Sequence, residues 1–160
     1  DLHRVDRRQR QMCIRDQDDM LSELMAIAKD NIDAWIHCAA VLDYIVSNPA
    51  KGKVASQQGS LQVDLVEGAK HIQLLKELCA NSVRIGFKLE SGIKQKDLIY
   101  RAVAQIENSG MTAVIANRLE DLGNPEKPRG YLVDTHGAHF ILEDQKKMCD
   151  AIQTFVEIGY

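Results

Sequence analysis

Helical and strand patterns alternate along the middle of the chain, and this alternation constrains the fold more than any other feature. Apolar residues recur at helical spacing over residues 70–80 and 95–108. Short apolar runs typical of strands cover residues 83–89 and 112–117. An alternating order of this kind is satisfied by a mainly parallel sheet with helices packed on both faces. We therefore predict an α/β fold.

The flanking segments add further elements to this sheet. A nearly continuous apolar run over residues 33–41 is typical of a parallel strand that is buried on both faces. The other expected elements are a helix over 18–29, short strands at 53–56 and 62–66, short strands at 131–134 and 139–142, and a final helix from Asp144. The complete prediction is a Rossmann-like α/β domain with a β-hairpin flap and with short strands and a helix after the main sheet.

Composition indicates one globular domain and excludes several classes of function. The 160 residues are 45% hydrophobic and 27% charged. No stretch approaches the roughly 20 apolar residues that span a bilayer, so we expect no membrane association and a cytoplasmic location. A net charge of -3 disfavours a nucleic-acid partner. The four cysteines lie far apart and form no C-x-x-C pair, which predicts reduced packing residues.

The first sixteen residues differ abruptly from the rest. They carry five arginines and no apolar periodicity. The stretch 7–16 back-translates without a break into a transposase-type sequencing adapter, so we interpret residues 1–16 as a non-native, adapter-encoded segment and leave Cys13 out of functional reasoning. A natural basic arm is the alternative.

Three side chains come late in the predicted strands or directly after them, where ligands gather in parallel sheets. Asp43 follows the first strand, Phe87 lies late in the second, and Asn117 ends the third. Each also has an ordinary structural explanation: a turn for Asp43, the core for Phe87 and a strand-end turn for Asn117. The sequence contains neither a G-x-G-x-x-G turn nor a P-loop.

Two other pairs of reactive side chains favour structural roles. His37 and Cys38 share a buried strand, with no acid nearby in sequence that would support a Cys-His nucleophile. His136 and His139 form an H-x-x-H pattern around a predicted turn, with no third ligand at metal-binding spacing. We predict packing for the first pair, a turn for the second, and no protein metal site.

Four short motifs together resemble the phosphopantothenate-cysteine ligase family. They are AAVLDY at 39–44, GKVAS at 52–56, IGFKLE at 85–90 and VIANRLED at 114–121, similar to the family's A-V-x-D-[YF], K-I-x-S, [GS]-F-[KA]-x-E and V-x-A-N. Their order and spacing also match. The resemblance implies that residues 17–160 are the C-terminal two-thirds of a ligase domain.

The resemblance implies roles for individual residues. Lys53 matches the family's flap lysine and is the expected catalytic residue, neutralising charge on the nucleotide. Asn117 matches the strand-end asparagine of V-x-A-N, with a substrate-binding or structural role. The expected nucleotide-binding residues are His37, Cys38, Ala39, Asp43, Gly68, Ala69, Lys70, His71 and Phe87.

The implied reaction joins 4'-phosphopantothenate to L-cysteine through an acyl-nucleotidylate, with ATP or CTP as co-substrate and Mg²⁺ as cofactor. The family also implies a homodimer. Bifunctional bacterial members carry an aspartate where Arg118 stands and lysines in place of Gln105 and Ser109, so the nucleotide stays open between ATP and CTP. The family's N-terminal glycine-rich strand-turn-helix does not occur in this sequence, and we expect the chain alone to be inactive.

Two other classes of function remain open. A dimerising nucleotide-binding module could keep the sheet and flap but would bind its ligand without turnover. A Rossmann-type oxidoreductase domain has a similar architecture. A G-x-G-x-x-G turn in the upstream sequence would favour the oxidoreductase, and a G-G-T-x-E-type turn there would favour the ligase.

Overall fold

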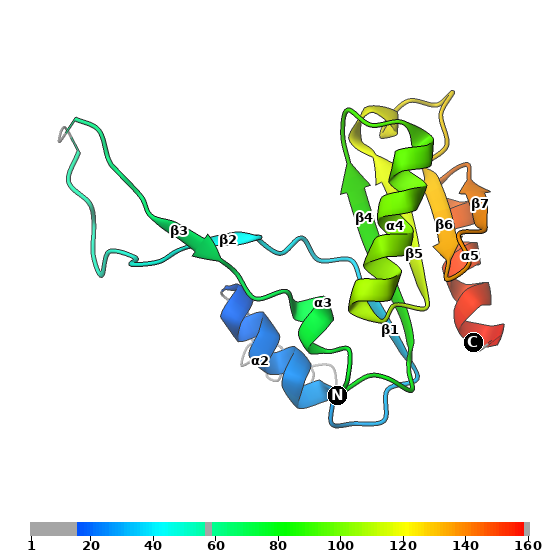
Figure 1. Cartoon of the computed structure of the whole chain (residues 1–160), viewed down its shortest axis with the longest axis horizontal. Coiled ribbons are helices and arrows are strands. Elements are labelled where there is room, and N and C mark those ends of the chain that lie inside the picture. Colours follow the sequence, from blue (N-terminus) through cyan, green and yellow to red (C-terminus); the bar gives the residue numbers. More distant parts are fainter. Residues whose placement is uncertain (1–15, 57–58, 159–160) are drawn as a thin grey trace, which may run out of the picture.

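The computed structural model describes residues 16–56 and 59–158, which fold around one five-stranded sheet (Figure 1). The sheet has the strand order β1-β4-β5-β6-β7. Its strands are β1 (Ala34–His37), β4 (Val83–Glu90), β5 (Ala113–Arg118), β6 (Gly130–Asp134) and β7 (His139–Leu142). Residues 1–15, including Cys13 and nearly all of the segment interpreted as adapter-encoded, lie outside the described residues.

Four of the five strands run in one direction. β1 pairs with β4 and β4 with β5 in parallel, whereas β6 is antiparallel to both of its neighbours, β5 and β7. The central strand β5 is buried along nearly its whole length, and β4 is buried over residues 84–86, as expected for strands covered on both faces. The predicted α/β class with a mainly parallel sheet is confirmed.

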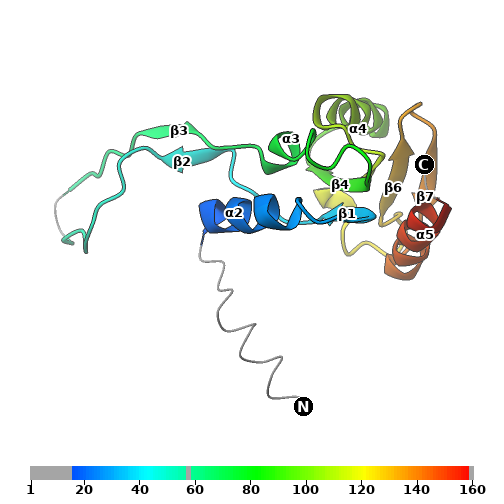
Figure 2. The same ribbon diagram turned by 90° about the horizontal axis from the view of Figure 1, so that it is seen from below.

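Helices cover both faces of the sheet (Figure 2). Helix α4 (Gln95–Ser109) packs on one face, where its buried residues Leu98, Ala102 and Ile106 meet Val114 of β5 and Val133 of β6. Helix α5 (Gln145–Ile158) packs on the other, contributing Phe155 to a cluster with Ile85, Ala113, Ile115, Leu132 and Leu142. Alternate residues of β5 thus face opposite helices, as the period of a strand requires.

A third, smaller cluster joins the segments beside β1. Helix α2 (Gln17–Ile27) begins after Asp16, whose carboxylate accepts hydrogen bonds from the amides of Asp18 and Asp19 and so caps the helix. Trp35 of β1 packs with Ala28, Leu75 and Cys79. Leu75 and Cys79 follow helix α3 (His71–Leu74), so this cluster connects α2, β1 and the chain after α3.

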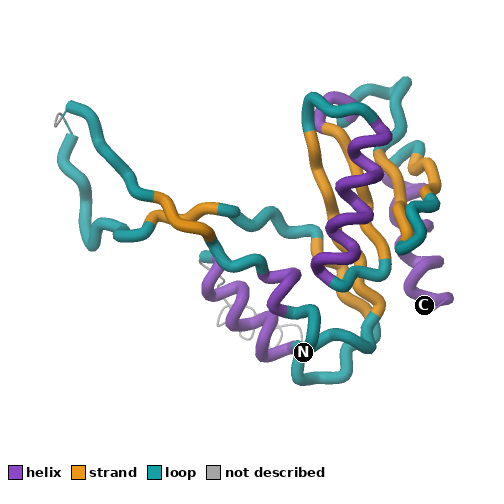
Figure 3. Tube along the Cα trace, in the orientation of Figure 1, coloured by secondary structure: helices purple, strands orange, loops and turns teal. Residues whose placement is uncertain are grey.

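A two-stranded ribbon leads into an arm that projects away from the sheet (Figure 3). β2 (Tyr44–Val46) pairs antiparallel with β3 (Leu65–Glu67), and residues 47–56 and 59–64 belong to the rest of the arm. A hairpin excursion was predicted, but its strands were misplaced. Residues 53–56 form no strand, and the predicted second strand at 62–66 overlaps β3 only at residues 65 and 66. The real partner of β3 is β2, which follows directly after Asp43.

Two further boundaries differ from the prediction. The helix expected over 70–80 is regular only over His71–Leu74 and continues as successive turns, because the amide of Lys76 bonds to the carbonyl of Gln73 in place of the α-helical Ile72 carbonyl. The strand expected over 33–41 ends at His37, where its pairing with β4 stops at Gly86. The chain then leaves the sheet toward the arm.

No helix in the described part of the chain combines the length and apolar character needed to cross a bilayer.

Candidate functional site

Asp43 and the segment 68–71 come together at the base of the arm. The amide of Gly68 donates a 2.8 Å hydrogen bond to the carbonyl oxygen of Asp43. The ammonium of Lys70 lies 4.0 Å from the Asp43 carboxylate, and both side chains are exposed. The structure therefore joins two predicted nucleotide-binding segments that have 24 residues between them in the sequence.

Gly68 is needed at this junction because the backbone approaches very closely. A Cβ atom at this position would lie 2.8 Å from the backbone carbonyl oxygen of Leu42 and 3.1 Å from the side-chain nitrogen Nε2 of Gln17. Contacts this short with a backbone atom require the chain to move. The glycine thus lets the start of α3 pack against the loop that carries Asp43.

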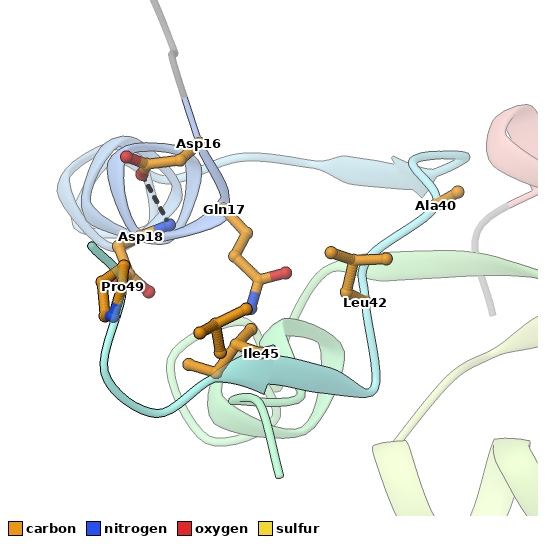
Figure 4. Close-up of a pocket in the computed structure, with 8 residues that line it drawn as sticks. Asp16, Gln17, Asp18, Ala40, Leu42, Ile45 and Pro49 are labelled. Atoms are coloured by element: carbon orange, nitrogen blue, oxygen red, sulfur yellow. Dashed lines mark hydrogen bonds between the residues drawn. The ribbon is translucent and has the colours of Figure 1, made fainter. Parts of the chain in front are cut away.

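A cleft of about 480 Å³ lies beside this junction (Figure 4). The Gln17 side chain extends toward Ile45 in the close-up. The cleft is lined by Asp16, Gln17, Asp18, Ala40, Leu42, Ile45, Val46 and Pro49. Two of these, Ala40 and Leu42, belong to the AAVLDY motif, but none is a predicted site residue.

His37 and Phe87 lie on neighbouring strands but face opposite sides of the sheet. His37 stacks on Trp35, with ring centroids 5.9 Å apart, and its register partner is Gly86. Phe87 packs at the margin of the cluster under α5. The two side chains can share a ligand only across the carboxyl edge of the sheet. Asn117, buried at the end of β5, alternates in register with Ile115 and so shares the face of Phe87.

Burial dominates the electrostatics of both predicted histidines. Desolvation, with a further contribution from the positive charge of Arg84, lowers the pKa of His37 to about 4. His71 is 2% exposed, and burial lowers its pKa although the Asp18 carboxylate acts in the opposite direction. The Nε2 atom of His37 and both ring nitrogens of His71 have no hydrogen-bond partner among the described residues. Both rings are therefore held neutral near pH 7.

The remaining predicted residues are exposed. Cys38 and Ala39 follow β1, and Ala69 precedes α3. Lys53 belongs to the arm, which points away from the sheet within a single chain. One chain alone therefore does not bring the arm toward Phe87.

Among residues 16–56 and 59–158, no group of three or more His, Cys, Asp and Glu side chains is arranged to hold a metal ion. A Mg²⁺ ion in a nucleotide site is commonly held by phosphates together with only one or two carboxylates. The Asp43 carboxylate at the arm base is exposed.

Sequence reasoning missed Arg84, which lies within β4 and is 1% exposed. Its guanidinium donates to the carbonyl oxygens of Ser109, Gly110 and Ile72. A single arginine between Val83 and Ile85 was the available signal, because a charge inside an apolar strand must find partners when it is buried.

Comparison with known proteins gives consistent results. The bifunctional coenzyme A biosynthesis protein CoaBC of Thermococcus kodakarensis is 38% identical over 94 residues, covering 59% of this chain and 23% of that protein. Its counterpart in Methanocaldococcus jannaschii is 33% identical over 101 residues, covering 63% and 24%. The chain thus spans about a quarter of the length of these curated relatives.

Solved structures show the same fold. The DNA/pantothenate metabolism flavoprotein from Streptococcus pneumoniae superposes with a TM-score of 0.72 at 22% identity, covering 89% of this chain and 71% of that one. A Cab2 variant in complex with phosphopantothenate-cysteine superposes with a TM-score of 0.65 at 22% identity, covering 87% and 50%.

One family of protein domains matches nearly the whole chain. The DNA/pantothenate metabolism flavoprotein C-terminal domain matches residues 4–158 and so extends into the segment interpreted as adapter-encoded. Together with the two CoaBC relatives, this match confirms the family resemblance seen in the four motifs. The chain belongs to the DNA/pantothenate metabolism flavoprotein C-terminal domain family, the family of the phosphopantothenate-cysteine ligases.

Proposed function

We propose that the chain forms the nucleotide-binding part of a ligase that joins 4'-phosphopantothenate to L-cysteine in coenzyme A biosynthesis. One observation carries the proposal. The AAVLDY motif and the segment 68–71 are distant in sequence, yet Asp43, Gly68 and Lys70 meet at the arm base in a protein of this family. A Cab2 variant of the same fold is complexed with phosphopantothenate-cysteine, which supports the choice of substrates.

The proposed reaction has two halves. A carboxylate oxygen of 4'-phosphopantothenate attacks the α-phosphorus of ATP or CTP, and pyrophosphate leaves. The cysteine amine then attacks the acyl carbon, the nucleoside monophosphate leaves, and the amine loses a proton as the amide forms. Both partners of the first half are anions, so the site needs fixed cations close to the α-phosphate. We assign this role to Lys53, with Mg²⁺ entering on the triphosphate.

Lys53 reaches such a site only if a second copy of the chain supplies it, and the arm supports this arrangement. Eight large apolar side chains on the arm and at its base are between 42% and 69% exposed. They are Leu42, Tyr44, Val46, Val54, Leu61, Val63, Leu65 and Val66. An isolated two-stranded ribbon is marginally stable in water, and a contiguous apolar surface of this kind favours a protein contact. We propose a homodimer in which each arm covers the site of its partner.

Substitution of Lys53 tests the proposal. Residues 17–160 would replace the matching part of Thermococcus kodakarensis CoaBC, so that the chimaera carries the N-terminal region of that protein. We expect pyrophosphate release that depends on 4'-phosphopantothenate, with either ATP or CTP. Lys53→Ala should abolish acyl-nucleotidylate formation, whereas Lys51→Ala, two residues away on the same arm, should retain most of it.

Other results of this experiment would lead to different conclusions. Equal effects of Lys53→Ala and Lys51→Ala would remove the catalytic assignment. Nucleotide binding without any pyrophosphate release would favour the non-catalytic module, and selective binding of NAD(H) would favour the oxidoreductase. The 160-residue chain alone should bind nucleotide without turnover.

The free thiols of Cys38, Cys79 and Cys149 support the proposed cytoplasmic location.

A further inference from the structure

The loop of residues 91–94 connects β4 to α4 at the carboxyl edge of the sheet and is held at three points. Glu90, directly before the loop, accepts a 2.6 Å hydrogen bond from Arg101 of α4. The amide of Gly92 donates to the carboxylate of Glu120. The carbonyl oxygen of Ile93 accepts from Arg118 at 3.3 Å. The last two contacts come from the segment that follows Asn117.

Arg118 is itself fixed by a bidentate ion pair. Its Nε donates to Oδ2 of Asp121 at 2.7 Å and its Nη2 to Oδ1 at 3.1 Å. Asp121 is 6% exposed, so this pair is shielded from water more than a surface pair. The third nitrogen, Nη1, donates to the carbonyl oxygen of Ile93. The carboxylate of Asp121 balances the positive charge of Arg118 before any ligand binds.

Gly92 adopts a turn that other residues avoid. Its φ is +68°, in the left-handed region, while a Cβ atom there would meet nothing within 4 Å. Backbone conformation, not space, therefore requires the glycine. The hydrogen bond to Glu120 stabilises this one conformation of the loop.

The Gly92–Glu120 contact is poorly placed to stabilise the whole fold. Gly92 and Glu120 are exposed and belong to none of the three apolar clusters, whereas Ile93 packs against the cluster under α4. Exposed polar contacts contribute little to global stability. They can nevertheless decide the shape of a loop, because a fixed loop loses less conformational entropy when a ligand binds.

We propose that Glu120 and Arg118 are positioning residues that hold the loop 91–94 in one conformation and thereby shape the rim of the nucleotide site. The loop continues the strand that carries Phe87, and Glu120 and Arg118 follow Asn117, so the IGFKLE and VIANRLED motifs form one unit. This inference rests on the proposed function, since only a nucleotide at this edge would meet the rim.

Hydrogen exchange at the Gly92 amide in the 160-residue chain tests the contact directly. Glu120→Ala should speed exchange at Gly92 about fivefold, the loss of one hydrogen bond to a charged acceptor that water partly replaces. Glu126→Ala is the matched control, because its exposed carboxylate makes no hydrogen bond that the structure records. Exchange at buried Ile115 should not change in either variant.

Nucleotide binding tests the positioning role. Glu120→Ala and Arg118→Lys should each raise the Kd for Mg-ATP or Mg-CTP about threefold to tenfold, since lysine cannot make the bidentate pair. Glu120→Ala should do so at an unchanged urea midpoint, because its contact to Gly92 is exposed. Nucleotide should slow Gly92 exchange in the wild type and not in Glu120→Ala, because coupling between two sites is reciprocal.

Unchanged Gly92 exchange in Glu120→Ala would overturn the contact. Faster exchange with an unaltered Kd would overturn the positioning role. If the wild-type chain binds neither nucleotide, the proposed function fails and the positioning role fails with it. Gly92 exchange would then still show whether Glu120 holds the loop.

Discussion

The Nη2 atom of Arg84 donates a 2.6 Å hydrogen bond to the carbonyl oxygen of Ile72, and this bond ties α3 to the central strand β4. Nη1 of the same side chain bonds to the carbonyls of Ser109 at 2.7 Å and Gly110 at 3.3 Å, where α4 ends. These bonds include no carboxylate. The guanidinium is instead stabilised by carbonyl groups, two of which lie at the negative end of the α4 dipole.

Replacing Arg84 should therefore destabilise the protein strongly. Arg84→Met leaves three inward-facing carbonyl groups without this donor, and we expect a loss of about 3 kcal/mol in the free energy of unfolding. Arg101→Met is the control, because the Arg101–Glu90 pair is partly exposed and should contribute less than ~1 kcal/mol. Urea unfolding followed by circular dichroism measures both. Equal losses in the two variants would contradict the proposed role of Arg84.

His37 should make stability depend on pH. Its native pKa of about 4 lies below its ordinary value of 6.5, so the unfolded chain binds more protons between these two values. The stabilisation from neutral His37 is complete above about pH 6.5 and is lost progressively as the pH falls toward 4.

Urea midpoints of the wild type and of His37→Gln, measured between pH 4.5 and 7.5, test this dependence. The difference between the two proteins should shrink as the pH falls. An NMR titration of the His37 ring with a midpoint near 6.5 would show that the ring is not desolvated as described.

Gly68 should tolerate no side chain. Gly68→Ala places a Cβ against the Leu42 carbonyl, and we expect a loss of about 2 kcal/mol together with separation of Lys70 from Asp43. Gly52→Ala is the matched control on the arm, since a Cβ there meets nothing within 4 Å. Thermal unfolding compares the two variants, and an equally stable Gly68→Ala protein would mean that the arm base is not closely packed.

The Asp43–Lys70 pair should matter for ligand binding and hardly for folding. The two charged atoms are 4.0 Å apart, and the side chains of Asp43 and Lys70 are 76% and 59% exposed, so Lys70→Ala should change stability by less than ~0.5 kcal/mol. A weaker affinity for ATP or CTP in this variant, measured by isothermal titration calorimetry, would then report a lost ligand contact. Unchanged affinity would remove Lys70 from the site.

The arm should control the oligomeric state. Leu61 on the arm is 69% exposed and Ile158 at the end of α5 is 70% exposed. Leu61→Glu should dissociate the proposed homodimer, whereas Ile158→Glu should not, because only the arm is expected to be covered by the partner. Sedimentation velocity distinguishes the two, and an identical effect of both substitutions would place the interface elsewhere.

The sequence predicted the centre of the fold to within about two residues, and the reason is local. β4, α4 and β5 have strong periodicity, because each is buried by its neighbours along a full face. Strand pairing in the arm is different. Residues 53–56 look like a strand in isolation, but whether a strand forms depends on a partner that the pattern does not identify.

The candidate site was less predictable because it depends on contacts between distant segments. Spacing along the chain gives no sign that Gly68 bonds to Asp43, or that Arg84 joins the ends of α3 and α4. The motif residues were recognised by resemblance alone. Their opposite placement on the sheet, with His37 on one face and Phe87 on the other, follows from strand register, which sequence patterns do not fix.

Because β6 runs antiparallel to β5, its direction decides which residues lie along the carboxyl edge of the sheet. A parallel successor to β5 would have carried the chain back across a face of the sheet, whereas β6 returns directly and leaves residues 119–129 standing along the carboxyl edge. Insertions or deletions within residues 119–129 should therefore widen or narrow access to this edge, while the packed layers of the sheet and helices stay unchanged.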